Sequence, residues 1–355
     1  MSLDDIDRVL SEAAIPRENI DMGQNAVSVP KDSYCIDRFV NPQKVLAFHE
    51  AGETIIFRGA HNWFPKLMAL CNDLSFFFHC RAQANLYLTP AHTQSSYPHW
   101  DSHDIFVLQL AGRKTWKLHE DRLPMPLPRY EFAPGRYEVG PENGAMTFSA
   151  GDFAYVPRGL IHNPVADAYS IHVAVGLPVV TWVELLEAMV ARCGDAKAPL
   201  RQALPAVIGE DHFDLEKVAR QFAELAALAM DKERLPALLQ ELTGRVLGRR
   251  RPSVRHRLAN FIAPMELGPD TTIKVRPDVR ISLEKRPAAI AVSFNDTELE
   301  FPESLEPELR NVLDRRRLKV REVSPHLDCG TAIAESLLQH GCIEVIALDG
   351  NRAHG

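Results

Sequence analysis

The sequence predicts a protein of mixed α and β class, with a β-rich first part, a helical middle part and a mixed last part. Three observations carry this prediction. Short β-rich runs broken by proline and glycine fill residues 30–178, helical periodicity takes over across residues 181–262, and the two patterns mix from about residue 270. A length of 355 residues is about twice the commonest domain size, so two or three domains are expected.

The β-rich part contains several apolar runs of strand length, with a helical stretch at residues 63–74 between the first two. These runs occupy residues 53–57, 84–88, 105–110 and 171–175. Many short strands separated by turn signals are typical of antiparallel sandwiches and barrels. We therefore expect an antiparallel β structure in this part.

The middle part is predicted to be a helical domain. Thr181 and Glu184 have the spacing of a capping box ahead of an apolar helix. A second helix carries its apolar residues on one face, and a third begins near Pro236 and ends near Gly248. The apolar stripe of the second helix consists of Leu215, Val218, Phe222, Leu225 and Met230. We expect these apolar faces to form a partner interface.

The last part combines a hairpin with two helices and a closing strand. Asn295-Asp296, a dipeptide that favours hairpin turns, lies between two apolar runs. The expected elements are strands at 289–294, 297–301 and 342–348 and helices at 306–316 and 331–339. Two helices with a β ribbon in about 85 residues resemble a winged helix.

Composition excludes several classes of protein. With 46% hydrophobic and 25% charged residues the chain has the composition of an ordinary globular protein. No apolar run approaches the roughly 18 residues of a membrane span, and the acidic, amphipathic start lacks the pattern of a signal peptide. The six cysteines form no CxxC pair and suit buried thiols in a reducing compartment. A cytoplasmic protein is therefore expected.

A nucleic-acid partner is not expected. The formal net charge is −7, and residues 271–355 contain 12 basic and 14 acidic residues, whereas nucleic-acid-binding modules are normally basic. The arginine-rich run at residues 249–257 is therefore interpreted as a linker or packing segment.

The strongest candidate for a metal site is His99-Trp100-Asp101. Residues i and i+2 of a strand face the same side, so His99 and Asp101 can reach one ion. Such triplets are expected by chance roughly twice in this composition, and the chain has at least four. Only the first leads into an apolar strand of the β-rich part. The other three, in charged or helix-capping contexts, are His119/Asp121, His212/Asp214 and His326/Asp328.

A third ligand has to come from another strand, and His162 is the best placed. It follows a turn marked by glycine and proline, 61 residues after Asp101. Two imidazoles and one carboxylate on one face, with open positions, form the arrangement of non-haem Fe(II) oxygenases. Zinc takes similar ligands, so the three residues alone leave the metal open.

Three separated motifs resemble those of the cupin-type JmjC oxygenases, in the same order. They are NLYLTP at 85–90, PHWDSHDIFVLQLAGRKTW at 98–116 and GDFAYVPRGLIHN at 151–163. The resemblance covers roughly residues 50–180 and is greatest to the ribosomal oxygenases, which hydroxylate side chains of ribosomal proteins. It implies a double-stranded β-helix (a jelly roll) that binds Fe(II) through His99, Asp101 and His162. It also implies 2-oxoglutarate and O₂ as cosubstrates.

The same resemblance implies roles for residues around the iron. Lys114 falls where the family often places a cation for the distal carboxylate of 2-oxoglutarate. Arg113 competes for this role, but neighbouring strand residues face opposite ways, so only one of the two is expected to point inward. Asn85 falls at a cosubstrate contact. The residues expected in the substrate pocket are Tyr87, His172, Trp100 and His103. The ribosomal oxygenases commonly have tyrosine in place of Trp100, which leaves the substrate open.

The predicted function is hydroxylation of a protein or peptide side chain by an Fe(II)- and 2-oxoglutarate-dependent dioxygenase. Two alternatives stay open: hydroxylation of a free amino acid or natural-product intermediate, and a non-catalytic cupin with a regulatory or binding role. The expected domains are an oxygenase domain at 1–180, a helical dimerisation domain at 181–265 and a winged-helix-like domain at 266–355. The resemblance favours a homodimer formed through the helical domain.

Overall fold

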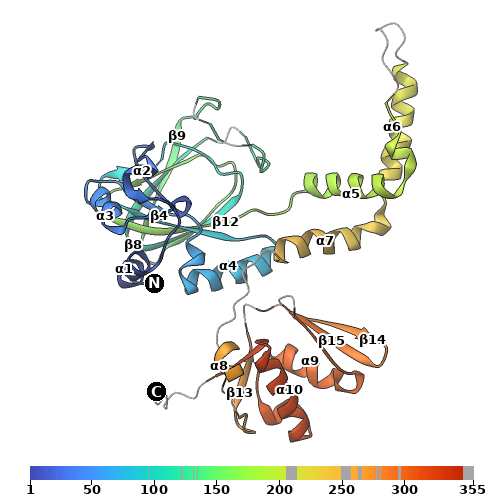
Figure 1. Ribbon diagram of the computed structural model, residues 1–355. Helices are drawn as coiled ribbons and strands as arrows, with labels where there is room; N and C mark the ends of the chain where they lie inside the picture. The colour runs from blue at the N-terminus through green and yellow to red at the C-terminus, as the bar shows by residue number, and fades with distance from the viewer. Residues whose placement is uncertain are drawn as a thin grey trace. The chain divides into compact units, whose positions relative to one another are not determined.

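The computed structural model comprises two compact units, Met1–Arg249 and Arg250–Gly355 (Figure 1). The residues that the structure describes are 1–94, 96–120, 123–130, 132–133, 135–204, 214–248, 257–262, 266–276, 279, 281–294 and 297–346. Within these ranges, no helix has both the length and the apolar character needed to cross a membrane.

The first unit begins with short elements whose apolar side chains join its main core. Helix α1 (Leu3–Glu12) starts with a capping box, because Ser2 Oγ accepts the Asp5 N–H at 3.2 Å and the Asp5 carboxylate accepts the Ser2 N–H at 2.9 Å. The elements that follow are η1 (Arg17–Asn19), β1 (Ile20–Gln24), β2 (Val27–Ser28), α2 (Lys31–Tyr34), β3 (Cys35–Ile36), β4 (Phe39–Val40) and α3 (Pro42–Glu50).

A ten-stranded antiparallel sheet forms the body of this unit. Its hydrogen-bonded order is β2-β1-β5-β6-β12-β8-β11-β7, and β9 and β10 also pair with β8. Strand β8 has 16 residues, so its first half pairs with β10 and β12 and its second half with β9 and β11. The strands after β4 are β5 (Thr54–Phe57), β6 (Gln83–Thr89), β7 (Thr93–Gln94), β8 (Asp104–His119), β9 (Glu142–Ser149), β10 (Phe153–Val156), β11 (His162–Ala166) and β12 (Ser170–Leu177).

The two ends of the strand order approach each other at the β1–β2 turn. The Asn25 N–H in this turn donates to the Gln94 carbonyl of β7 at 2.8 Å. Asn25 and Ala26 have φ of 50° and 58°, as a two-residue hairpin turn of the primed type requires. The hydrogen bond thus links the two ends of the strand order, so the sheet curls back on itself. The antiparallel β structure predicted from the sequence is confirmed.

All four predicted strands are present, with shifted ends. The largest difference concerns residues 105–110, which are only the first half of β8. The sequence hides the second half because Gly112, Arg113 and Lys114 interrupt the apolar run. The predicted helix at 63–74 is present as η2 (Ala60–Asn62) followed by α4 (Pro65–Phe78), in which proline occupies the first turn.

Gly112 allows β8 and the turn before β12 to approach closely. Its φ is +64°, and a Cβ atom there would lie 1.6 Å from the Tyr169 carbonyl oxygen. We expect Gly112→Ala to lower the thermal unfolding midpoint by roughly 10 °C or more, because the clash adds to about 1 kcal/mol of left-handed backbone strain. Gly151→Ala is the matched control, since φ is +97° there and nothing lies within 4 Å. Equal midpoints for the two variants, measured by calorimetry, would contradict this explanation.

Three longer helices follow the sheet: α5 (Trp182–Ala196), α6 (Leu215–Ala229) and α7 (Leu235–Gly248), with short turns η3 (Ala198–Arg201) and η5 (Lys232–Arg234). The predicted capping box is confirmed, since Glu184 Oε2 accepts the Thr181 N–H at 2.7 Å and Thr181 Oγ1 accepts the Glu184 N–H at 3.2 Å. Asp214 caps α6 through the Lys217 N–H at 2.9 Å, which confirms its reading as an N-cap. The buried cluster of Leu185, Met189, Cys193 and Leu238 joins α5 to α7.

The second unit contains two three-stranded antiparallel sheets, of order β17-β13-β18 and β14-β15-β16. Residues 306–315 and 327–339, two of its helices, pack with both sheets around one apolar core. The elements are α8 (Arg257–Ile262), β13 (Thr272–Val275), β14 (Ser282–Arg286), β15 (Ala289–Phe294), β16 (Thr297–Pro302), η6 (Glu303–Leu305), α9 (Glu306–Arg315), β17 (Arg317–Lys319), η7 (Val320–Glu322), α10 (Leu327–Gln339) and β18 (Ile343–Val345).

The predicted hairpin, the two helices and the closing strand are all present in this unit. One prediction is wrong: Asp328 does not cap a helix start, because α10 begins at Leu327 and Asp328 lies in its first turn, with no side-chain cap bond at His326. The turn pair Asn295-Asp296 lies outside the described residues, as do His212, Asp121 and residues 249–256 of the arginine-rich run.

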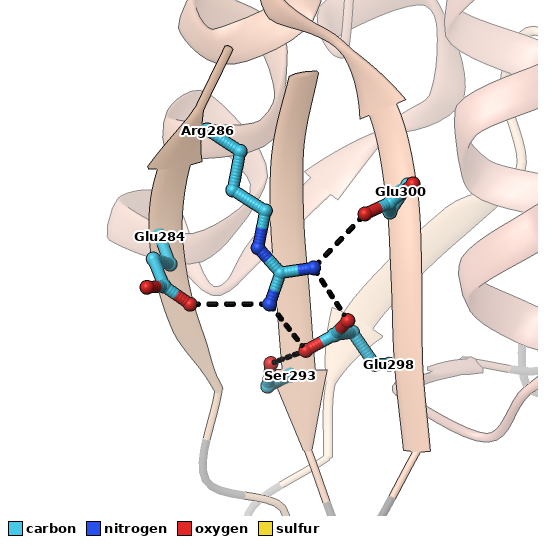
Figure 2. A network of polar contacts seen from close by, with 5 residues as sticks. All are labelled: Glu284, Arg286, Ser293, Glu298 and Glu300. Atoms are coloured by element: carbon cyan, nitrogen blue, oxygen red, sulfur yellow. Dashed lines mark hydrogen bonds and ion pairs between the residues drawn. The ribbon is translucent and has the colours of Figure 1, made fainter.

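A network of charges holds the outer face of the β14-β15-β16 sheet together (Figure 2). The Arg286 guanidinium on β14 donates to Glu298 at 2.7 and 2.9 Å, to Glu300 at 2.9 Å and to Glu284 at 3.2 Å. Arg286 lowers the pKa of Glu298. Glu298 pairs with Arg286 in a bidentate manner and also accepts from Ser293 Oγ, so the network links all three strands. These contacts within the sheet account for the cluster of charges without any ligand.

Candidate metal centre

Three side chains with metal-binding atoms converge where β11 begins. His99 and His162 are paired across two chain segments, each backbone N–H donating to the other residue's carbonyl oxygen at 3.0 and 2.8 Å. Directly opposed residues of an antiparallel pair present their side chains on one face, and Asp101, two residues on from His99, joins them. One ligand atom from each of the three residues lies within 4.8 Å of the others, and His162 Nε2 is 3.6 Å from Asp101 Oδ2.

Hydrogen bonds to backbone carbonyls orient both imidazoles and select the tautomer that binds a metal. Nδ1 of His99 lies 2.8 Å from the Tyr97 carbonyl oxygen, and Nδ1 of His162 lies 3.0 Å from that of Leu160. A carbonyl only accepts, so Nδ1 carries the hydrogen in each ring and Nε2 keeps a free lone pair. Burial, together with the neighbouring His99, lowers the pKa of His162 to about 4. His162 is therefore neutral at pH 7, as a metal ligand must be.

The donor set fits Fe(II), the metal that the family resemblance implies. Two imidazole nitrogens and one carboxylate oxygen on the wall of a cavity match the ligands of non-haem Fe(II) sites, in which other positions stay open. The Trp116 ring stacks on His162 at 5.0 Å between centroids and fixes its orientation further. Within the described ranges, no other three His, Cys, Asp or Glu side chains form such a group.

The three residues line an open cavity of about 560 Å³ on the large sheet. A cavity of this size accommodates a small cosubstrate together with part of a second molecule. Among the predicted site residues, Asn85, Tyr87, His103 and His172 also line it. Its wall further includes residues from the β1–β2 hairpin, from the end of β5 and from β12, among them Asp21, Gly23, Ser28, Arg58, Ala174 and Gly176.

Lys114 is fully buried, whereas the competing Arg113 is exposed. Lys114 Nζ donates to Thr89 Oγ1 at 3.1 Å and lies 6.0 Å from the centre of the Tyr87 ring. Lys114 itself is not among the residues that line the cavity. Burial lowers its pKa from 10.5 to about 7, because the charged ammonium is removed from water. A buried ammonium beside a neutral hydroxyl is a site where an anion is favoured.

Tyr87 and His172 form a stacked pair in the cavity wall. Their rings lie 4.6 Å apart and within 7° of parallel, on paired positions of β6 and β12. Burial raises the pKa of Tyr87, and burial, followed by the charge of Lys114, lowers that of His172 well below its usual range. His172 Nδ1 is buried without a hydrogen-bond partner in the described part of the chain. Asn85 Oδ1 accepts the Gly59 N–H at 3.0 Å.

The two remaining predicted pocket residues differ in position. His103 lies against Gly176, where a Cβ atom would come within 2.6 Å of the imidazole Nε2, so the glycine makes room for the ring beside the cavity. Trp100 instead points away from the cavity, because its neighbours His99 and Asp101 occupy the other side of the extended chain. Its indole is buried against Phe132 and Tyr137, at 5.8 and 5.4 Å between ring centres. A pocket role for Trp100 is therefore not supported.

No sequence pattern indicated the charged pair of Asp21 and Arg58 in the cavity wall. Arg58 Nε donates to Asp21 Oδ2 at 2.7 Å, and Lys31 Nζ lies 2.9 Å from Asp21 Oδ1. Burial raises the pKa of Asp21, but the hydrogen bonds and charges of Arg58 and Lys31 together outweigh this effect, so the pKa lies below its usual value. Asp21 lies between the buried Ile20 and Met22 in a short strand. Only this alternation of apolar and polar residues could have suggested that Asp21 faces a cavity.

Known proteins share sequence similarity with the part of the chain that contains this site. The JmjC domain family matches residues 60–185. A bifunctional lysine-specific demethylase and histidyl-hydroxylase, NO66, of Aedes aegypti is 31% identical over 204 residues, which are 54% of this chain and 32% of that protein. The NO66 of Dictyostelium discoideum is 31% identical over 189 residues, 52% of this chain and 37% of that protein. The chain thus spans about a third of the length of these relatives.

Solved structures extend the similarity of fold beyond this domain. The ribosomal oxygenase YcfD of Escherichia coli, in complex with cobalt and 2-oxoglutarate, has a TM-score of 0.54 at 13% identity and covers 98% of this chain and 91% of that one. YcfD with cobalt and succinic acid has a TM-score of 0.52. At this identity the match concerns the fold. Residues 60–185 of this chain therefore match the JmjC domain family, and the fold of the chain is similar to that of YcfD.

Proposed function

We propose that this protein is an Fe(II)- and 2-oxoglutarate-dependent dioxygenase that hydroxylates a side chain of a protein or peptide. The convergence of His99, Asp101 and His162 on one cavity carries this proposal. NO66 and YcfD, whose names describe a demethylase and histidyl-hydroxylase and a ribosomal oxygenase, support it. When bound, Fe(II) with 2-oxoglutarate and O₂ supplies the oxidation that places a hydroxyl group on the substrate and yields succinate and CO₂.

The chain's own residues have separate tasks in this proposal. His99, Asp101 and His162 hold the metal, with both Nδ1 atoms fixed by backbone carbonyls. The buried Lys114 pairs with the distal carboxylate of 2-oxoglutarate, and Asn85 contacts the cosubstrate. Tyr87 and His172 orient the bound molecules through the stacked pair, and His103 contributes to the substrate side.

Succinate formation tests the proposal directly. The purified protein is loaded anaerobically with Fe(II) and 2-oxoglutarate and then exposed to O₂ with fractions of a cell lysate. We expect one or more protein fractions to raise succinate release above the level without substrate. Stimulation by the small-molecule fraction alone would assign the enzyme to free metabolites, and no succinate in any fraction would contradict an oxygenase.

The affinity for 2-oxoglutarate is expected to fall as the pH rises above about 7. Burial holds the pKa of Lys114 near that value, so the ammonium that pairs with a carboxylate is present below pH 7 and is lost above it. Each further pH unit then reduces the affinity by up to roughly tenfold. Calorimetric titration from pH 6 to 9 with saturating metal measures this effect. Lys114→Met, which cannot titrate, is expected to bind weakly at every pH, and a flat wild-type profile would contradict the role.

We also propose that the chain forms a homodimer through residues 181–262. The stripe on α6 supports this proposal, since Phe222 is 72% exposed and Leu215 is 68% exposed, and Trp182 on α5 is 78% exposed. Several large apolar side chains exposed on neighbouring helices are typical of a protein–protein interface. Light scattering is expected to give about twice the chain mass of 39.8 kDa. Phe222→Asp is expected to yield folded monomers, and a wild-type mass near that of one chain would contradict the dimer.

We also propose a domain division, a winged-helix-like last domain and a cytoplasmic location. The change from strands to helices after β12 supports a boundary between an oxygenase domain at 1–180 and a helical domain at 181–265. The second compact unit, which begins at Arg250, supports a separate last domain, placed at 266–355. A winged-helix-like character of the last domain is supported by α9, α10 and the β14–β16 ribbon. A cytoplasmic location is supported by six free cysteines, five of them buried.

A further inference from the structure

The edge of the large sheet runs along the rim of the cavity. Strand β2 is the last strand at one end of the hydrogen-bonded order, and both of its residues are exposed. Ser28 of this strand lines the cavity that contains the metal-ligand group. Residues 1–50, which supply this edge, precede the part of the chain that the JmjC domain family matches. An unpaired strand edge is a template for another extended chain.

The register of the β1–β2 hairpin leaves the backbone of Ser28 free on its outer side. In a hairpin closed by two residues, the residues that flank the turn exchange both hydrogen bonds, and these are Gln24 and Val27. The next pair, Gly23 and Ser28, therefore has no hydrogen bonds between its members, and the bond from the Val29 N–H to the Met22 carbonyl at 2.9 Å continues the alternation. The N–H and C=O of Ser28 point away from β1.

No partner takes up these two groups in the described part of the chain. No described residue donates to the Ser28 carbonyl or accepts from its N–H, and the residue is exposed. Pro30 follows two residues later and lacks an N–H, so the free edge offers one complete pair of groups. An extended polypeptide matches such a pair, because each of its residues presents an N–H and a C=O on the same side.

We propose that the protein substrate adds a short antiparallel strand to β2, with one substrate residue exchanging both backbone hydrogen bonds with Ser28. Side chains of directly opposed residues share a face of the sheet. Since the Ser28 side of β2 faces the cavity, the paired substrate residue also directs its side chain toward the metal-ligand group. The edge thus selects an extended segment and positions the side chain to be hydroxylated. This inference rests on the proposed function, for which it supplies the mode of substrate binding.

Ser28→Pro tests the inference on the enzyme side. Proline removes the N–H that the fold does not use, and the preceding Val27 is already extended, as proline requires. Wild-type and variant proteins are incubated with Fe(II), 2-oxoglutarate and total lysate protein under ¹⁸O₂, and labelled residues are located by mass spectrometry. We expect labelling by Ser28→Pro to fall by about tenfold or more, at an unchanged thermal midpoint. The control Val27→Thr changes the side chain on the other face and is expected to label like the wild type.

Synthetic peptides test the same inference on the substrate side, independently of how the variant folds. Two peptides are built around the residue that the wild type labels, one unmodified and one N-methylated at that residue, which removes the donor to the Ser28 carbonyl. We expect the methylated peptide to lose at least about tenfold in kcat/KM. Equal rates for both peptides, or full labelling by Ser28→Pro, would overturn strand addition while leaving the oxygenase intact. Succinate formation without labelling of any protein would overturn the proposed protein substrate, and strand addition with it.

Discussion

Replacing Asp101 with alanine is expected to abolish turnover, with succinate formation below about one-hundredth of the wild-type rate. Asp101 supplies the only carboxylate of the metal-ligand group, and its Oδ2 lies 3.6 Å from His162 Nε2. Two neutral imidazoles alone bind Fe(II) weakly, and the negative charge that balances the ion is lost. Metal titration and succinate release measure the two consequences together. His99→Ala is expected to behave in the same way.

The fold is expected to survive both substitutions. Asp101 and His99 are half-buried on the cavity wall, outside the apolar core. His326→Ala is the matched control, because His326 and Asp328 repeat the His-x-Asp spacing where no metal-ligand group forms in the described chain. It is expected to keep full activity. Wild-type succinate production by Asp101→Ala at limiting iron would refute the assignment of the ligands.

Lys114→Ala is expected to raise the Michaelis constant for 2-oxoglutarate by roughly 10- to 150-fold, far more than that for the protein substrate. A charge-assisted hydrogen bond contributes about 1.5–3 kcal/mol, and this range corresponds to that factor. The effect is largest below pH 7, because burial lowers the pKa of Lys114 to about 7 and the lysine is charged only below it. Initial rates at pH 6.5 with either substrate varied separate the two Michaelis constants.

Arg113→Ala provides the comparison for this experiment. Arg113 is the neighbouring cation on β8, and it is exposed while Lys114 is fully buried. The substitution Arg113→Ala is therefore expected to leave the Michaelis constant for 2-oxoglutarate within about twofold of the wild-type value. A large effect of Arg113→Ala together with none of Lys114→Ala would show that the inward cation was wrongly assigned.

Local signals in the sequence determined much of what this fold contains. Apolar runs between turn residues located the strands, and the capping pairs at Thr181 and Asp214 located two helix starts, since both signals depend on neighbours within four residues. The i and i+2 spacing of His99 and Asp101 follows from strand geometry alone. The glycine and proline turn before His162 indicated the third ligand, and the motifs shared with a known family then supplied Lys114 and Asn85.

Tertiary structure decided the features that depend on residues far apart in the sequence. Strand β8 continues past Gly112 only because β9 and β11 supply hydrogen bonds there. Trp100 turns away from the cavity because the pairing of His99 with His162 fixes which face of the chain is inside. Asp21 and Arg58 meet only where β1 pairs with β5. The free edge at Ser28 likewise exists because β2 ends the sheet beside the cavity, and strand order is a property of the whole chain that no local pattern encodes.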